Sequence, residues 1–79
     1  MSDDDRDILQ PFVDRLFRDR KRVSRLDAVL MAEALDVGPD LTTIIDLLPP
    51  GTHTRQRLAD QLNSALIGHG WNQRFGTVD

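Results

Sequence analysis

Two histidines are the residues of this sequence best suited to metal binding or proton transfer. His53 and His69 stand near the two ends of residues 54–67, whose apolar spacing predicts a helix. In a continuous helix, a rise of about 1.5 Å per residue separates the two rings by roughly 24 Å, too far to share an ion. A histidine beside a helix end is expected to cap the helix or to lie in solvent. The chain has no cysteine, which removes thiolate ligands and disulfides.

The other patterns typical of catalysis are also missing from the sequence. The serines form no nucleophile elbow and stand at no spacing that pairs them with a base. The aspartates of residues 3–5 are consecutive, without the alternating ligands and glycine of a calcium loop. The glycines of residues 66–76 follow no predicted strand and precede no lysine at the spacing of a phosphate loop. We therefore expect a protein that is not an enzyme and that uses no cofactor or metal.

Charge is arranged in bands along the chain. Residues 1–14 carry a net charge of −4, residues 15–25 carry +5, residues 26–54 carry −5, and the remainder carries +1. Part of the positive charge complements the end of the first predicted helix and pairs with nearby aspartates. The excess predicts a surface that attracts another macromolecule, an acidic protein above all. The residues expected to form this basic band are Arg18, Arg20, Lys21, Arg22 and Arg25.

Two further partners follow from the same charge pattern. The acidic residues 26–54 match the basic band, so copies of the chain are also able to associate with one another. A membrane surface is disfavoured, because the first half of the basic amphipathic segment is acidic. No signal peptide or membrane-spanning run is recognisable, and we expect a cytoplasmic protein.

Four helices are predicted from apolar spacing and from start and stop residues. The first lies within residues 3–22, where Ser2 and the following aspartates suit a helix start. Pro11 costs about 3 kcal/mol inside a helix, so it predicts either a kink or a main helix that begins there. The apolar stripe of this helix comprises Ile8, Leu9, Phe12, Val13, Leu16 and Phe17.

The second helix is predicted to follow Ser24, which with Asp27 forms a capping box. Its buried face is expected to contain Leu26, Val29, Leu30, Ala34, and Leu35 or Val37, and Gly38 with Pro39 is expected to end it. The third helix covers residues 40–48, with Asp40 as its cap and with Leu41, Ile44, Ile45 and Leu48 on one face.

The fourth helix is predicted to begin after Thr52 or Thr54 and to bury Leu58, Leu62, Ala65 and Leu66. The tail contains Trp71, Phe75 and Val78, so it is expected to fold back on the core, in part as a short extended piece. There is no internal repeat and no linker that separates domains. Residues 1–79 are thus predicted to form a single all-α domain, a compact bundle of about four short helices with a thin margin of stability.

Two segments resemble parts of a helix-turn-helix motif. In residues 31–48 the likeness ends at the second helix, whose only charges are Asp40 and Asp46, a poor match for phosphate. In residues 41–63 the fourth helix would be the recognition helix and the tail a rudimentary wing. Its groups for phosphates and base edges are Thr54, Arg55, Gln56 and Arg57. Asp60 and a turn with two prolines oppose this interpretation. A helix-turn-helix or winged-helix-like DNA-binding regulator is therefore the alternative to a protein-binding regulatory module.

Overall fold

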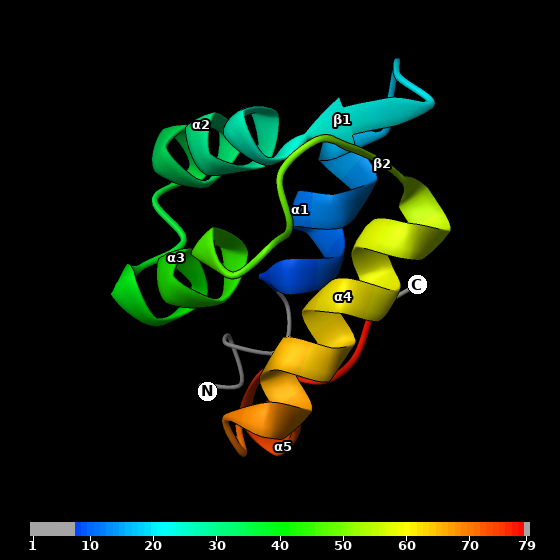
Figure 1. The fold of residues 1–79 in the computed structure, drawn as a ribbon. Coiled ribbons are helices and arrows are strands. Elements are labelled where there is room, and N and C mark those ends of the chain that lie inside the picture. The colour runs from blue at the N-terminus through cyan, green and yellow to red at the C-terminus, as the bar shows by residue number, and fades with distance from the viewer. Residues whose placement is uncertain (1–7, 79) are drawn as a thin grey trace.

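The computed structural model describes residues 8–78, which form mostly short helices together with one small two-stranded sheet (Figure 1). The elements are α1 (Leu9–Leu16), β1 (Arg22–Ser24), α2 (Arg25–Leu35), α3 (Pro39–Asp46), β2 (Thr52–Thr54), α4 (Arg55–Gly68) and α5 (Asn72–Phe75). The predicted helical majority is confirmed, with 63% of residues 8–78 in five helices. The expectation of a strictly all-α fold is wrong, because the two strands pair with each other.

The sheet joins two segments that are distant in the sequence. β1 and β2 run antiparallel, with Arg22 opposite Thr54, Val23 opposite His53, and Ser24 opposite Thr52. Each strand has three residues, too few for an alternating pattern to stand out in the sequence. The last residue of each strand, Ser24 or Thr54, also caps the helix that follows. Because the strands are antiparallel, α2 and α4 leave the sheet at its opposite ends (Figure 1).

The order helix, strand, helix occurs twice in the chain. α1, β1 and α2 form the first unit, α3, β2 and α4 form the second, and the strands join the two units. The side chain of Ser24 accepts a hydrogen bond from the Asp27 amide, and that of Thr54 accepts one from the Arg57 amide. The structural repeat has no counterpart in a sequence repeat, because the two units share cap positions rather than residue types.

The predicted apolar stripes of three helices form the core. The buried core residues of α1 are Leu9, Phe12, Val13 and Leu16. Those of α3 and the residues just after it are Leu41, Ile44, Ile45 and Leu48, and those of α4 are Leu58, Ala59, Leu62 and Leu66. Ile8 and Phe17 are partly buried against this cluster, as is Ala65. Ile67 lies outside it and is exposed. Nearly all of the core positions predicted for these helices are confirmed.

α1 is shorter than predicted. It begins at Leu9, so Pro11 lies in the first turn, where its missing N–H breaks no intrahelical bond and a kink is unnecessary. The helix ends at Leu16, and residues 17–21 form a connection that carries much of the basic band. The start predicted at Ser2 and the following aspartates lies outside the described residues.

The buried face of α2 differs from the prediction. The capping box of Ser24 and Asp27 is confirmed, with both hydrogen bonds at 3.0 Å. The helix buries Ala28 and Ala32, whereas Leu26 is 64% exposed and Leu30 is 54% exposed. α2 packs against α1 and α3, and alanine on this face permits a close approach of the helices. The larger leucines are left on the outside.

The junction between α2 and α3 also departs from the prediction. α2 ends at Leu35, and Asp36 adopts the left-handed conformation with φ of 53°. Gly38, with φ of 99°, is the N-cap of α3, and Pro39 is its first residue. Pro39 therefore starts the third helix, a position where its fixed φ suits the helix. Asp40 lies in the first turn of α3 and is not its cap.

The tail folds back as predicted, although as a helix rather than as an extended piece. Phe75 in α5 and Val78 are buried, and Trp71 is partly buried. The Asn63 side chain of α4 holds Val78 through two hydrogen bonds, 2.8 Å from the Val78 amide and 2.9 Å to its carbonyl. This pair of bonds ties the end of the described chain to α4.

Candidate functional site

The five residues of the predicted basic band have different neighbours in the structure. Arg20 forms an ion pair with Asp27 at 3.3 Å, and Arg25 donates a hydrogen bond of 3.3 Å to the Leu48 carbonyl. Arg18 and Lys21 are exposed in the connection after α1, and Arg22 is exposed on β1. All five residues are thus exposed, and two of them, Arg20 and Arg25, also have partners within the domain.

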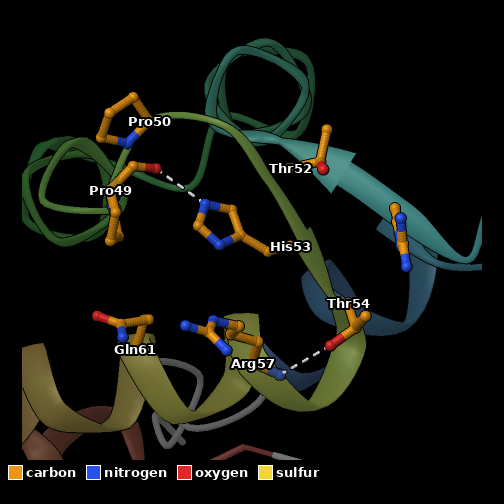
Figure 2. A pocket seen from close by; sticks show the side chains of 8 residues that line it. Pro49, Pro50, Thr52, His53, Thr54, Arg57 and Gln61 are labelled. Atoms are coloured by element: carbon orange, nitrogen blue, oxygen red, sulfur yellow. Dashed lines mark hydrogen bonds between the residues drawn. The ribbon is translucent and has the colours of Figure 1, made fainter.

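A surface pocket brings Arg22 together with residues of the fourth helix. The pocket has a volume of about 390 Å³ and lies between the segment that leads into β2 and the first turns of α4 (Figure 2). Its lining consists of Arg22, Pro49, Pro50, Thr52, His53, Thr54, Arg57 and Gln61. Arg22 was predicted in the basic band, and Thr54 and Arg57 were predicted as DNA contacts. The two sets of residues, separate in the sequence, thus meet at one site.

The sheet and the start of α4 position the two arginines of this pocket. Arg22 pairs with Thr54 across the sheet, and Thr54 caps α4 by accepting from the Arg57 amide at 3.3 Å. Within residues 8–78, no carboxylate lies within ion-pairing distance of Arg22 or Arg57. The N-terminal end of the 14-residue α4 adds the positive end of its dipole. The pocket is therefore suited to a negatively charged group.

His53 lies beneath this pocket and is only 5% exposed. Its Nε2 atom is 2.8 Å from the Pro49 carbonyl. Because a carbonyl only accepts, Nε2 is the donor and the neutral ring keeps a lone pair on Nδ1. Nδ1 is buried and has no hydrogen-bond partner among the described residues. Figure 2 shows the ring between Pro49 on one side and Arg57 and Gln61 on the other.

The burial of His53 was not predicted from the sequence. A capping or solvated side chain was expected there, but the central position of β2 turns this side chain inward, opposite the buried Val23. A three-residue strand leaves no alternation by which the inward direction could be read from the sequence. The other histidine, His69, is exposed at the C-terminal end of α4 and stacks with Trp71 at 5.0 Å between ring centroids.

The residues predicted to read DNA are only partly brought together. Arg55 turns toward α1, where it donates to the Asp14 carboxylate. This hydrogen bond, supported by one from Gln10, lowers the pKa of Asp14 below its ordinary value. Thr54, Gln56 and Arg57 line one hollow together with Asp60, whereas Arg55 lines a different one with Gln56 and Asp60. The first turn of α4 therefore does not present all four predicted residues to one ligand.

Metal binding has no support in the described part of the chain. Residues 8–78 contain no group of three or more histidine, cysteine or acidic side chains that could hold a metal ion. The connection between α1 and β1, which in a calcium-binding helix–loop–helix unit supplies oxygen ligands, contains Arg18, Arg20 and Lys21 instead. Within residues 8–78, none of the helices has the length and apolar character needed to cross a lipid bilayer.

No family model, curated protein or solved structure matches the chain. The geometry of the domain itself is consequently the basis for a functional proposal. That geometry is a small, mostly helical domain with a cationic pocket where two strands meet the N-terminus of a helix.

Proposed function

We propose that this chain is a non-catalytic binding module that takes an acidic segment of another protein at the pocket between Arg22 and Arg57. The observation that carries the proposal is the meeting of these two arginines, from β1 and α4, at a pocket beside a helix N-terminus. Neither has a carboxylate partner among residues 8–78. Carboxylates of a partner would supply the missing counter-charge and accept paired hydrogen bonds from the guanidinium groups.

Further cationic side chains lie near the pocket. Arg18 and Lys21, exposed near the start of β1, would steer an acidic partner toward this side of the domain.

Several features favour a protein partner over duplex DNA. Residues 47–54 between α3 and α4 include β2, whereas a helix-turn-helix connects its helices by a turn of three to four residues. Arg55 is engaged with Asp14, and Asp60 lies one turn along α4. The tail forms α5 and is tied to Asn63, so this segment supplies no β wing. A DNA-binding regulator stays the alternative, since Thr54, Gln56 and Arg57 are all exposed.

Titration with two defined ligands separates these functions. Isotope-labelled protein is mixed with an oligoglutamate peptide, or with a random-sequence DNA duplex, at low and at physiological salt, and amide shifts are followed by NMR. We expect the peptide to shift the amides of residues 22, 53 and 57. The combined change Arg22→Ala and Arg57→Ala should weaken binding about tenfold or more, because a charged contact is lost.

The matched control is Arg15→Ala with Arg74→Ala, which removes the same charge from exposed positions outside the pocket. Equal losses in the two double variants would mean that only overall charge matters, and the pocket would lose its role. No peptide binding at low salt would overturn the proposal. Tighter binding of the duplex, lost on Gln56→Ala with Arg57→Ala, would establish the DNA-binding alternative.

A further inference from the structure

The outer face of the small sheet is the floor of two neighbouring hollows. The middle residue of each strand is buried, so the residues on either side of it point outward, away from the core. Across the strands these outward residues form two pairs, Arg22 with Thr54 and Ser24 with Thr52. Arg22 and Thr54 line the cationic pocket, Ser24 lines a second hollow of about 370 Å³, and Thr52 lines both. The two hollows therefore adjoin each other along the sheet.

The second hollow has apolar walls. They include Leu26 and Val29 of α2 and Pro50 of the segment that leads into β2. Leu26 is 64% exposed, so a large apolar side chain is available there to a ligand. Pro50 and Thr52 line the cationic pocket as well (Figure 2). We therefore treat the two hollows as one sheet groove, with a cationic end at Arg22 and Arg57 and an apolar end at Leu26, Val29 and Pro50.

From this continuity we infer that the acidic segment of the partner also carries a large apolar residue, which fills the apolar end of the sheet groove while a carboxylate binds at the cationic end. The inference rests on the proposed function, because one segment occupies both ends. Charge orients the segment, since Arg22 and Arg57 attract the carboxylate. Arg25, which also lines the apolar end, donates a hydrogen bond to the Leu48 carbonyl within the domain. An exposed leucine beside a charged pocket is typical of a binding groove, in which apolar contact supplies affinity and a few polar groups supply orientation.

The sheet sets the spacing between the two residues of the segment. Arg22 and Ser24 are two positions apart on β1, as are Thr54 and Thr52 on β2, and two residues of extended chain span roughly 6.5 Å. An extended segment that lies along the sheet covers the same distance in two residues. Residues two positions apart in an extended chain also point to the same side. The carboxylate and the apolar side chain are therefore expected at positions i and i+2 of the segment, in either order.

Short peptides with blocked ends and equal charge test the inference by NMR titration of the full chain at low salt. Glu-Ser-Leu-Ser-Glu has its leucine two positions from each glutamate and reads the same in both directions. Glu-Leu-Ser-Ser-Glu has the same composition with its leucine one and three positions away, and Glu-Ser-Ala-Ser-Glu has no large apolar residue. We expect the first peptide to bind about tenfold more tightly than the other two, because only its leucine reaches the apolar end. It should also shift the amides of residues 26, 29 and 51.

Substitution of the leucine in the groove tests where the peptide leucine binds. Leu26→Ser should bring the first peptide down to the affinity of the alanine peptide. The circular dichroism spectrum should stay unchanged, because the Leu26 side chain is mostly exposed. The matched control Leu30→Ser changes a leucine one turn further along α2, which is 54% exposed and lines neither end of the sheet groove. This control should keep the preference for the first peptide.

The outcomes separate this inference from the proposed function. Equal binding of the first peptide and the alanine peptide, both weakened by Arg22→Ala with Arg57→Ala, would overturn the inference and leave the proposed function in place. Equal binding of the two leucine peptides would also overturn it, as would a preference that Leu26→Ser and Leu30→Ser reduce equally. If neither these peptides nor oligoglutamate bind at low salt, the proposed function falls and the inference falls with it.

Discussion

The face that α2 turns toward the core is the most direct point at which the structure can be tested. Spacing in the sequence predicts that Leu30 is buried, whereas the structure exposes 54% of it and buries Ala32 to 1% exposure. Two substitutions on the same helix therefore have opposite expected effects under the two arrangements. Leu30→Ala shortens a side chain on the outer face, and Ala32→Leu enlarges one on the inner face.

The magnitudes follow from burial. Complete burial of a leucine stabilises a fold by about 1.5–3 kcal/mol, and less than half of Leu30 is buried, so Leu30→Ala should cost about 1 kcal/mol or less. Ala32→Leu adds three carbons where α2 packs closely on its neighbours, and overpacking of this kind costs about 1–3 kcal/mol. Leu62→Ala, at a position with no exposure, serves as the reference and should cost about 2–5 kcal/mol.

Urea unfolding followed by circular dichroism measures all three variants. An unchanged slope of the unfolding free energy against urea concentration establishes that the variants expose the same surface on unfolding. The reasoning is refuted by a loss of about 2 kcal/mol or more for Leu30→Ala together with no loss for Ala32→Leu. That outcome would restore the leucines to the core.

Four further predictions concern the helix ends and the tail. Ser24→Ala should lower the free energy of unfolding by about 1 kcal/mol, because the capping box loses one bond. The hydrogen bond from the Ser24 amide lowers the pKa of Asp27. The Asp27 carboxylate therefore stabilises the fold above its ordinary pKa of about 4, and this stabilisation is lost as the pH falls through the lowered pKa. Asp27→Asn should accordingly reduce the loss of stability in acid unfolding. Asn63→Ala should cost about 1–2 kcal/mol and speed hydrogen exchange at the Val78 amide, whereas unchanged exchange would show that the tail is held by its apolar contacts alone. Asp36→Gly should raise the thermal midpoint, with a gain of about 0.5–1 kcal/mol from relief of a left-handed conformation, and a lower midpoint would contradict that assignment.

Much of the local structure was determined by the sequence alone. The caps Ser24 and Thr54 act on the amides of the residues three positions later, which is a short-range interaction that spacing reveals. The stripes of α1, α3 and α4 were predicted because most of the large apolar side chains of each of these helices lie on one side. In such helices hydrophobicity decides the buried face before any neighbour is known.

The tertiary structure decided which of the two apolar sides of α2 is buried, and which segments that are distant in the sequence lie together. On α2, Leu26 and Leu30 mark one side and Ala28 and Ala32 the other, and the close approach of α1 and α3 selects the alanines although the leucines are more hydrophobic. The strands are too short to form alone, and pairing between residues 22–24 and 52–54 makes them. That same non-local pairing turns His53 inward and brings Arg22 to Thr54, so the cationic pocket exists only because the two halves of the chain pack together.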